Sequence, residues 1–258
     1  MAVEELISFM RNDISQKFPE NMDKIFVFSN LLKLKFSRAD HIDLIRSLMT
    51  SFPKSAFIFP AYTYNSRTLQ PYSSNQKPNP QCGSLSRVVF EEFKESLVRT
   101  FDEDYSYFVL NHQNLSEDFL GDITKWRESS FGESSHHDAM FSESGIFLIV
   151  ADEMDSGFTP SMQCEAVANV PYRRMELFPS MARKGNIKRY FARQENEFDS
   201  FGKACRWRSL NLMRQENILA TCNHNLGPKT FAFPVKQYID AVTQELVVNP
   251  NLFLEESK

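Results

Sequence analysis

Three short apolar runs constrain the fold of this chain more than any other feature of its sequence. They occupy residues 24–29, 55–59 and 145–151. Between the first two runs, Ser37 and Asp40 form the pattern of a helix capping box, and the apolar residues that follow recur on one helical face. Strands that are apolar throughout, separated by a helix, are typical of parallel strands buried on both faces. We therefore predict an α/β fold with a mixed central sheet and flanking helices.

The rest of the chain alternates between strand-like and helix-like segments. The hydrophobic spacing predicts strands at 97–101, 105–110, 172–178, 187–192, 218–222 and 230–233, and helices at 3–14, 85–97, 160–168 and 234–246. Proline and polar residues dominate residues 60–80, which predicts a long surface loop, and loops of that length are usually functional or disordered. Because no repeat or linker is visible, we expect residues 1–258 to form a single domain.

Charge and composition exclude several classes of function. The net charge is −4, which is the wrong sign for a surface that binds nucleic acid. Glycine contributes only 8 residues, and neither Gly-x-Gly-x-x-Gly nor a Walker loop occurs, which argues against dinucleotide-binding and kinase folds. No apolar run approaches the roughly 18 residues of a membrane span. The four scattered cysteines favour reduced thiols in a cytoplasm. We expect a small-molecule ligand and no nucleic-acid or membrane partner, and the sequence leaves the oligomeric state open.

Several local motifs follow one another in register with the predicted elements. The main ones are Phe28-Ser29-Asn30-Leu31, Pro60-Ala61-Tyr62-Thr63, Gly83-Ser84-Leu85-Ser86, the segment from Arg99 to Ser106, Ser130-Phe131-Gly132, and the segment from Thr159 to Glu165. This series resembles the aminoglycoside 3-N-acetyltransferase family, whose members move an acetyl group from acetyl-coenzyme A to an amine of a sugar-like ring. The resemblance implies the same fold, coenzyme A or acetyl-coenzyme A as a substrate, and an amino sugar such as an aminoglycoside as the acceptor.

Two histidines of the family pattern are replaced in this chain. The family carries Thr-x-x-His-x-x-Glu on a helix, and here Met162 stands at the histidine while Glu165 is kept. Asp102 stands where a second motif has histidine. Acyl transfer to an amine needs an unprotonated amine, a base for its proton and donors for the developing oxyanion. Three repairs are open: Glu165 or Asp102 is the base, His136 or His137 supplies an imidazole, or positioning alone suffices. Glu165 with His137 is our first choice.

Six residues are candidates for holding coenzyme A. They follow predicted strands or precede a predicted helix, where hydroxyls and free N–H groups bind amides and phosphates: Ser29, Asn30, Tyr62, Thr63, Gly83 and Ser84. The alternative for the hydroxyl-bearing and amide residues is ordinary helix capping and turn formation.

Other charged and imidazole groups have weaker interpretations. Acidic runs at 102–104 and 152–155 either line a cleft for a polycationic sugar or form solvated faces. His136 and His137 suggest a metal site, but adjacent side chains point apart and no third ligand follows at a recognisable spacing, so we expect an exposed loop or a helix start there and no metal. His41 is expected to be solvated between two aspartates. Basic pairs at 173–174, 188–189 and around Trp207 are candidates for phosphate contacts.

These features lead to one function and two alternatives. The first is a coenzyme A-dependent N-acyltransferase that acts on an amine of an aminoglycoside or amino sugar. The second is a catalytically silent protein of the same fold that serves as a binding or assembly protein, which the loss of both histidines favours. The third is a phosphate-ester or nucleotide binder that uses Arg206 and Arg208.

Overall fold

A mixed sheet of seven strands organises the structure, which is a computed structural model. It describes residues 2–29, 37–150, 158–193, 204–223 and 229–254. The strand order is β3-β4-β2-β1-β5-β9-β8. The strands are β1 Lys24–Ser29, β2 Ala56–Pro60, β3 Val98–Arg99, β4 Tyr107–Leu110, β5 Ile146–Val150, β8 Ala220–Asn223 and β9 Lys229–Pro234. β1 pairs in parallel with β2 and β5, and the pairings toward both edges are antiparallel. The predicted mixed sheet is therefore confirmed.

Helices connect and cover the strands. They are α1 Ala2–Phe9, α2 Ser15–Lys17, α3 Arg38–Ser51, α4 Asn65–Thr68, α5 Gly83–Glu92, α6 Glu117–Ile123, α7 His136–Met140, α8 Pro160–Val167, α9 Ala204–Gln215 and α10 Val235–Val248, with a π-helical segment Met10–Ile14 and 3₁₀ turns at Pro19–Asn21, Pro80–Cys82, Lys94–Ser96 and His112–Asn114. The predicted capping box of α3 is present, because the Ser37 hydroxyl accepts from the Asp40 N–H and the Asp40 carboxylate accepts from the Ser37 N–H. No helix in the described ranges is both long and apolar enough to traverse a bilayer.

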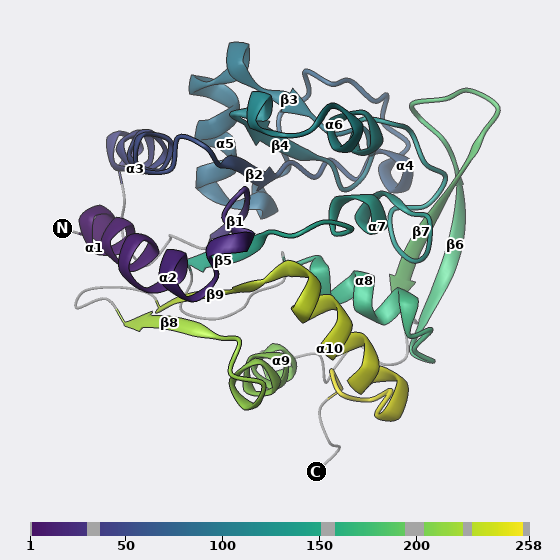
Figure 1. Cartoon of the computed structure of the whole chain (residues 1–258). Helices are drawn as coiled ribbons and strands as arrows, with labels where there is room; N and C mark the ends of the chain where they lie inside the picture. Colours follow the sequence, from purple (N-terminus) through teal and green to yellow (C-terminus); the bar gives the residue numbers. More distant parts are fainter. Residues whose placement is uncertain (1, 30–36, 151–157, 194–203, 224–228, 255–258) are drawn as a thin grey trace.

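Alternate residues of the central strands enter two separate cores. In β1, Phe26 and Phe28 belong to one cluster with residues of α6 to α10, whereas Ile25 and Val27 belong to a second cluster with residues of α1, α3 and α5. Both faces of the sheet are thus covered, as the apolar β1, β2 and β5 sequences predicted. Figure 1 shows α1 and α3 on one side of the sheet and α8 to α10 on the other.

A separate two-stranded hairpin stands beside the main sheet. It consists of β6 Arg173–Pro179 and β7 Ile187–Arg193, which pair in antiparallel register. Figure 1 shows it at the far side from the N-terminus, next to α7 and α8. We call β6, β7 and the turn between them the arm. Periodicity predicted both strands but not their separation from the main sheet.

Several predicted boundaries differ from the structure. The segment 60–80 contains the short α4 and the turn Pro80–Cys82 as well as loop. The helix expected at 85–97 ends at Glu92, because a 3₁₀ turn follows, and the strand expected at 97–101 covers only Val98–Arg99. The short helices α6 and α7 and the helix α9 were not predicted. Two of these are too short to show a periodic apolar face.

Candidate functional site

Two of the family-like motifs meet at a buried cluster of hydroxyl groups and an imidazole. Thr159, which precedes α8, places Oγ1 2.8 Å from the Tyr62 hydroxyl and 2.7 Å from the Tyr107 hydroxyl. His137 of α7 lies on the same group, with Nε2 3.2 Å from the threonine oxygen and 3.0 Å from the Tyr107 hydroxyl. All four side chains are at most 2% exposed. We call them the hydroxyl cluster.

The imidazole of the hydroxyl cluster has a defined protonation state. Nδ1 of His137 lies 2.7 Å from the Ser130 carbonyl, which only accepts, so Nδ1 carries the proton and Nε2 accepts from the hydroxyls. Burial lowers the pKa of His137 to about 3, so the ring is neutral near neutral pH. A ring with so low a pKa is a weak acceptor for a proton from an alkylamine.

Glu165 has different neighbours from His137. One carboxylate oxygen accepts a hydrogen bond from the Tyr172 hydroxyl at 3.0 Å, and the other forms an ion pair of 2.6 Å with Nη2 of Arg173. Within the residues that the structure describes, no hydrogen bond or ion pair joins Glu165 to His137. Met162, one turn earlier on α8, packs against the apolar core. The carboxylate is buried, and its nearest cation is a guanidinium rather than an imidazole.

Asp102 is the centre of a buried polar network. Its carboxylate accepts from Nζ of Lys188 at 2.6 Å, from the Ser130 hydroxyl and from two backbone N–H groups. Burial alone would raise the pKa of Asp102, but the Lys188 ammonium outweighs it and holds the pKa well below its usual range. The side chains of Asp102 and Lys188 are 0% exposed. This group joins the arm to the body of the protein.

The acidic run at 102–104 does not line a cleft, which corrects one of the interpretations made from the sequence. Glu103 accepts from the Ser180 hydroxyl and from two N–H groups at the tip of the arm, and Asp104 accepts from the N–H and hydroxyl of Ser66 in α4. All three acids are at most 1% exposed. Asp102 and Glu103 therefore both bind the arm, and Asp104 binds α4. The second acidic run, at 152–155, lies outside the described residues.

The predicted coenzyme A residues fall into two groups. Ser29, Gly83 and Ser84 lie near the surface, at the end of β1 and the start of α5. Gly83 has a φ of +85°, and a Cβ there would come within 3.0 Å of the Ser29 carbonyl oxygen, so the two motifs touch and only glycine fits. Tyr62 belongs to the hydroxyl cluster, and the buried Thr63 donates to the Glu103 carbonyl. Asn30 lies outside the described residues.

Two other expectations about polar residues are wrong. His41 is only 4% exposed rather than solvated, and its ring bridges the Ser37 carbonyl and the Ser84 hydroxyl. The basic pairs do not form a free patch, because Lys188 is buried on Asp102 and Arg173 on Glu165. Arg208 donates to two carbonyls near the C-terminal end of the described chain. The side chain of Arg206 lies outside the described part.

Sequence reasoning missed Tyr107, Arg173 and Lys188 as parts of the site. Tyr107 appeared only as a strand residue, and the two cations were interpreted as members of basic pairs. All three residues lie in segments that were predicted as strands. The sequence around them does not indicate which distant residues they contact.

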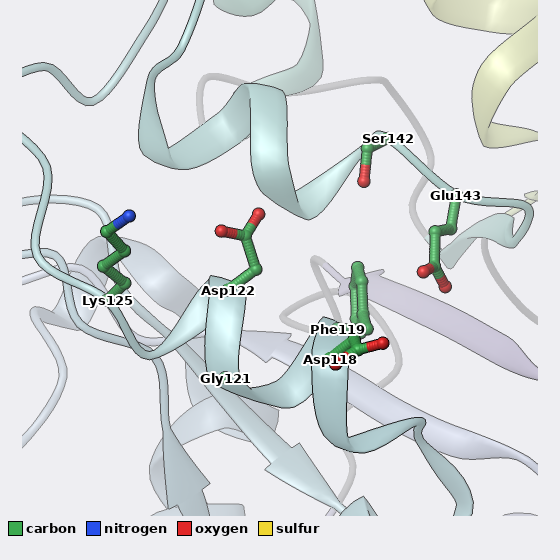
Figure 2. Close-up of a pocket in the computed structure, with 7 residues that line it drawn as sticks. All are labelled: Asp118, Phe119, Gly121, Asp122, Lys125, Ser142 and Glu143. Carbon is green, nitrogen blue, oxygen red and sulfur yellow. The ribbon is translucent and has the colours of Figure 1, made fainter.

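A pocket of about 410 Å³ lies on another part of the molecule. Figure 2 shows carboxylates of Asp118, Asp122 and Glu143 around it, together with Lys125. Two of these carboxylates already have cationic partners, because Asp122 pairs with Arg127 and Glu143 with Lys24. None of the residues predicted for catalysis or coenzyme A binding lines this pocket.

The buried histidines predict an acid-sensitive fold. Burial lowers the pKa of His136 to about 4 and that of His137 to about 3, so between roughly pH 6.5 and 4 the unfolded chain binds two protons that the folded chain does not. Asp104 acts in the opposite direction, because burial and the neighbouring Asp102 raise its pKa to about 7 and the folded chain keeps that proton. Between about pH 6 and 5 the net difference is one proton, and the free energy of unfolding should fall by about 1.4 kcal/mol per pH unit on acidification. Below about pH 5 the lowered pKa values of Asp102 and Glu91 add to the fall, because the unfolded chain protonates these groups first.

Urea denaturation at a series of pH values between 7 and 4 measures this slope. Asp104→Asn removes the opposing group and should make the fall steeper. A free energy of unfolding that is constant over this range in both proteins would contradict the assignment of neutral buried imidazoles.

Comparison with sequence models of protein families and with curated protein sequences found no match. Solved structures do resemble the chain. The aminoglycoside acetyltransferase AAC(3)-IVa apoenzyme matches with a TM-score of 0.72 and 14% identity over 98% of this chain and 91% of that one. The binary complex of AAC-IIIb with CoASH matches with a TM-score of 0.67 and 11% identity over 96% and 98%. YokD from Bacillus subtilis matches with a TM-score of 0.65 and 14% identity over 96% and 99%. At these identities the likeness establishes architecture, and the chain has the fold of the aminoglycoside 3-N-acetyltransferases, as the order of its motifs predicted.

Proposed function

We propose that the protein binds an acyl-coenzyme A thioester and transfers the acyl group to an amine of an amino sugar of the aminoglycoside type. Two kinds of support converge on this proposal. A structure of the same fold binds CoASH, and others of that fold are aminoglycoside acetyltransferases. The family-like motifs of this chain also come together in space.

The contact between Tyr62 and Thr159 is the observation that carries the proposal. These residues belong to different motifs, 97 positions apart in the sequence, and their hydroxyls lie 2.8 Å apart. Gln163 of α8 adds a second link, because its side-chain amide accepts from the Gly132 N–H at 2.9 Å and donates to the Gly132 carbonyl at 3.3 Å. Motifs that were recognised only by their order are thus joined by direct contacts.

The start of α5 fits a phosphate group of coenzyme A. The residue before the helix, Cys82, makes no side-chain capping bond, and the Gly83 N–H donates to the Pro80 carbonyl, so the N–H groups after Gly83 are the ones considered for a phosphate. The N-terminus of a helix attracts anions through these groups and its dipole. Ser84 is exposed there, and Ser29 lies next to Gly83. We assign Ser29, Gly83 and Ser84 to coenzyme A binding, with Tyr62 and Thr63 supporting the adjacent backbone.

In our proposal, acyl transfer relies on holding the amine and the thioester in place and not on a general base. The amine nitrogen forms a bond to the thioester carbonyl carbon, the C–S bond breaks, and the proton that leaves the nitrogen ends on the departing thiolate. Glu165 orients the amine. His137 and Asp102 hold the segments around it, since the first is a weak base and the second is engaged by Lys188.

Ser84→Asp tests the coenzyme A assignment. An aspartate in the first turn repels a phosphate, so affinity for acetyl-coenzyme A should fall at least about tenfold. The change also removes the Ser84 hydroxyl from Nε2 of His41, so the melting temperature is measured alongside to separate lost binding from lost stability. Ser96→Asp, an exposed change beyond the other end of α5, is the matched control. Isothermal titration gives the affinities, and equal binding by all three proteins would overturn the assignment. Thiol release with a panel of amino sugars tests the transfer itself.

A silent binding protein is the second candidate function. The specific observation that favours it is the engagement of Glu165 by Arg173 and Tyr172, together with a thioether at position 162. Such a protein would bind coenzyme A or an amino sugar yet release no thiol with any acceptor. Saturable thiol release above the rate of a Glu165→Ala variant would exclude it.

A further inference from the structure

The buried carboxylate of Glu165 is neutralised by a cation from the arm. Arg173 is the first residue of β6, and its Nη2 lies 2.6 Å from Oε2 of Glu165. The two side chains are 5% and 3% exposed. The guanidinium carbon lies 5.1 Å from the centre of the Phe191 ring, which supports it from β7. This arrangement puts a positive charge at the one carboxylate of α8.

The contact between Arg173 and Glu165 depends on the charge of the guanidinium and not on its ability to form two parallel hydrogen bonds. Arginine usually grips a carboxylate with two parallel hydrogen bonds. Here Oε1 is taken by the Tyr172 hydroxyl, and Oε2 has no well-directed hydrogen bond despite the close ion pair. Nε of Arg173 is buried and has no hydrogen-bond partner among the described residues. Arg173 thus contacts the carboxylate through one nitrogen and leaves another donor unbonded. A compact ammonium group, which has three rotatable donors, can take the place of such a cation.

We propose that Arg173 is an internal substitute for a ligand ammonium, and that Glu165 binds an ammonium or amine of the incoming amino sugar when Arg173 is displaced. The choice of an amino sugar rests on the proposed function. The exchange replaces one cation by another, so the carboxylate stays neutralised and no covalent bond changes. Tyr172 keeps Oε1 in place throughout, which leaves Oε2 as the position at which the two cations compete.

This competition makes Arg173 an autoinhibitory contact. A ligand must displace the guanidinium before it binds, and its apparent affinity falls in proportion to the fraction of molecules in which Oε2 is free. A buried carboxylate without a cation is strongly unfavourable, so loss of Arg173 should increase the affinity of Glu165 for a cation from solution. Both effects can be measured without any acyl-transfer reaction.

Chemical rescue of Arg173→Ala tests the site. This change removes the cation and opens space at Glu165, so we expect a lower melting temperature that millimolar guanidinium or glucosamine restores saturably, beyond the effect of sodium chloride at equal ionic strength. Arg173→Lys supplies its own ammonium and should show no rescue. Arg174→Ala is the matched control, because Arg174 is the adjacent, exposed arginine paired with Glu176. The double variant Arg173→Ala with Glu165→Gln should lose the response. Absence of rescue in Arg173→Ala, or equal rescue in Arg174→Ala, would overturn the inference.

Arg173→Met provides a second measurement if the alanine variant does not fold. It keeps an apolar stem over Phe191 but removes the charge. Titration with glucosamine should show at least about tenfold tighter binding than the wild type, and equal or weaker binding would overturn the inference. These outcomes are separable from the proposed function. Rescue without thiol release in any assay would leave the cation site in place and remove the transferase, whereas thiol release without rescue would do the reverse.

Discussion

Replacement of Lys188 by methionine is expected to lower the free energy of unfolding by about 3–5 kcal/mol, because it leaves the carboxylate of Asp102 buried without its cation. Asp102 and Lys188 are fully buried, and their 2.6 Å contact joins β7 to the segment before β4. Methionine fills a similar volume, so the loss should come from the uncompensated charge rather than from a cavity. Urea denaturation followed by circular dichroism measures it.

A double variant separates the charge from the packing. Asp102→Asn added to Lys188→Met removes the orphaned charge, and the double variant should be more stable than Lys188→Met alone. A decrease in the free energy of unfolding of less than about 1 kcal/mol for Lys188→Met, which is the range of an exposed pair, would show that the ion pair does not hold the arm in place. Arg189→Met is the matched control, since Arg189 is the neighbouring, half-exposed cation paired with Glu128.

Thr159→Val is expected to cost about 2–3 kcal/mol of unfolding free energy, because it removes the hydroxyl on which three other groups converge. The Tyr62 and Tyr107 hydroxyls and Nε2 of His137 all lie within 3.2 Å of this oxygen. Valine has nearly the same shape, so the cost reflects buried polar groups that lose a partner, each worth about 1–3 kcal/mol. Chemical denaturation measures the change.

Ser161→Ala is the control for Thr159→Val. It removes a buried hydroxyl from the same helical turn, but that hydroxyl donates only to the Phe158 carbonyl, so its loss should be near 1 kcal/mol. Equal effects of the two substitutions would show that Thr159 is not the centre of a cooperative cluster. A larger effect of Thr159→Val, together with reduced thiol release, would place the cluster in the support of the proposed site.

Much of the fold could be predicted because its signals are local. The β1 strand, Lys24–Ser29, coincides with its apolar run, and the Ser37 capping box sets the start of α3. Burial on both faces follows from strands without polar positions, which is why β1, β2 and β5 were expected at the centre of the sheet. The short α6 and α7 gave no such signal, because five or seven residues do not complete enough turns to show a periodic face.

The candidate site was predictable only in part. Sequence reasoning named Glu165, His137 and Asp102 as catalytic candidates but did not predict their burial, and it paired Glu165 with an imidazole, whereas the structure places Arg173 there. The acidic run at 102–104 was expected to face a ligand or solvent, but Asp102 and Glu103 instead bind the arm and Asp104 binds α4. A charge in a sequence shows that a partner is needed but does not say which one.

The sequence by itself determined the strands, their burial and the order of the family-like motifs, because apolar periodicity and capping act between residues only a few positions apart. Only the tertiary structure decided the partners of the polar groups. Asp102 meets Lys188 across 86 positions, and Arg173 reaches Glu165 because the chain turns back from α8 into the arm. Ion pairing acts through space, and its free energy depends on burial and distance rather than on separation along the chain.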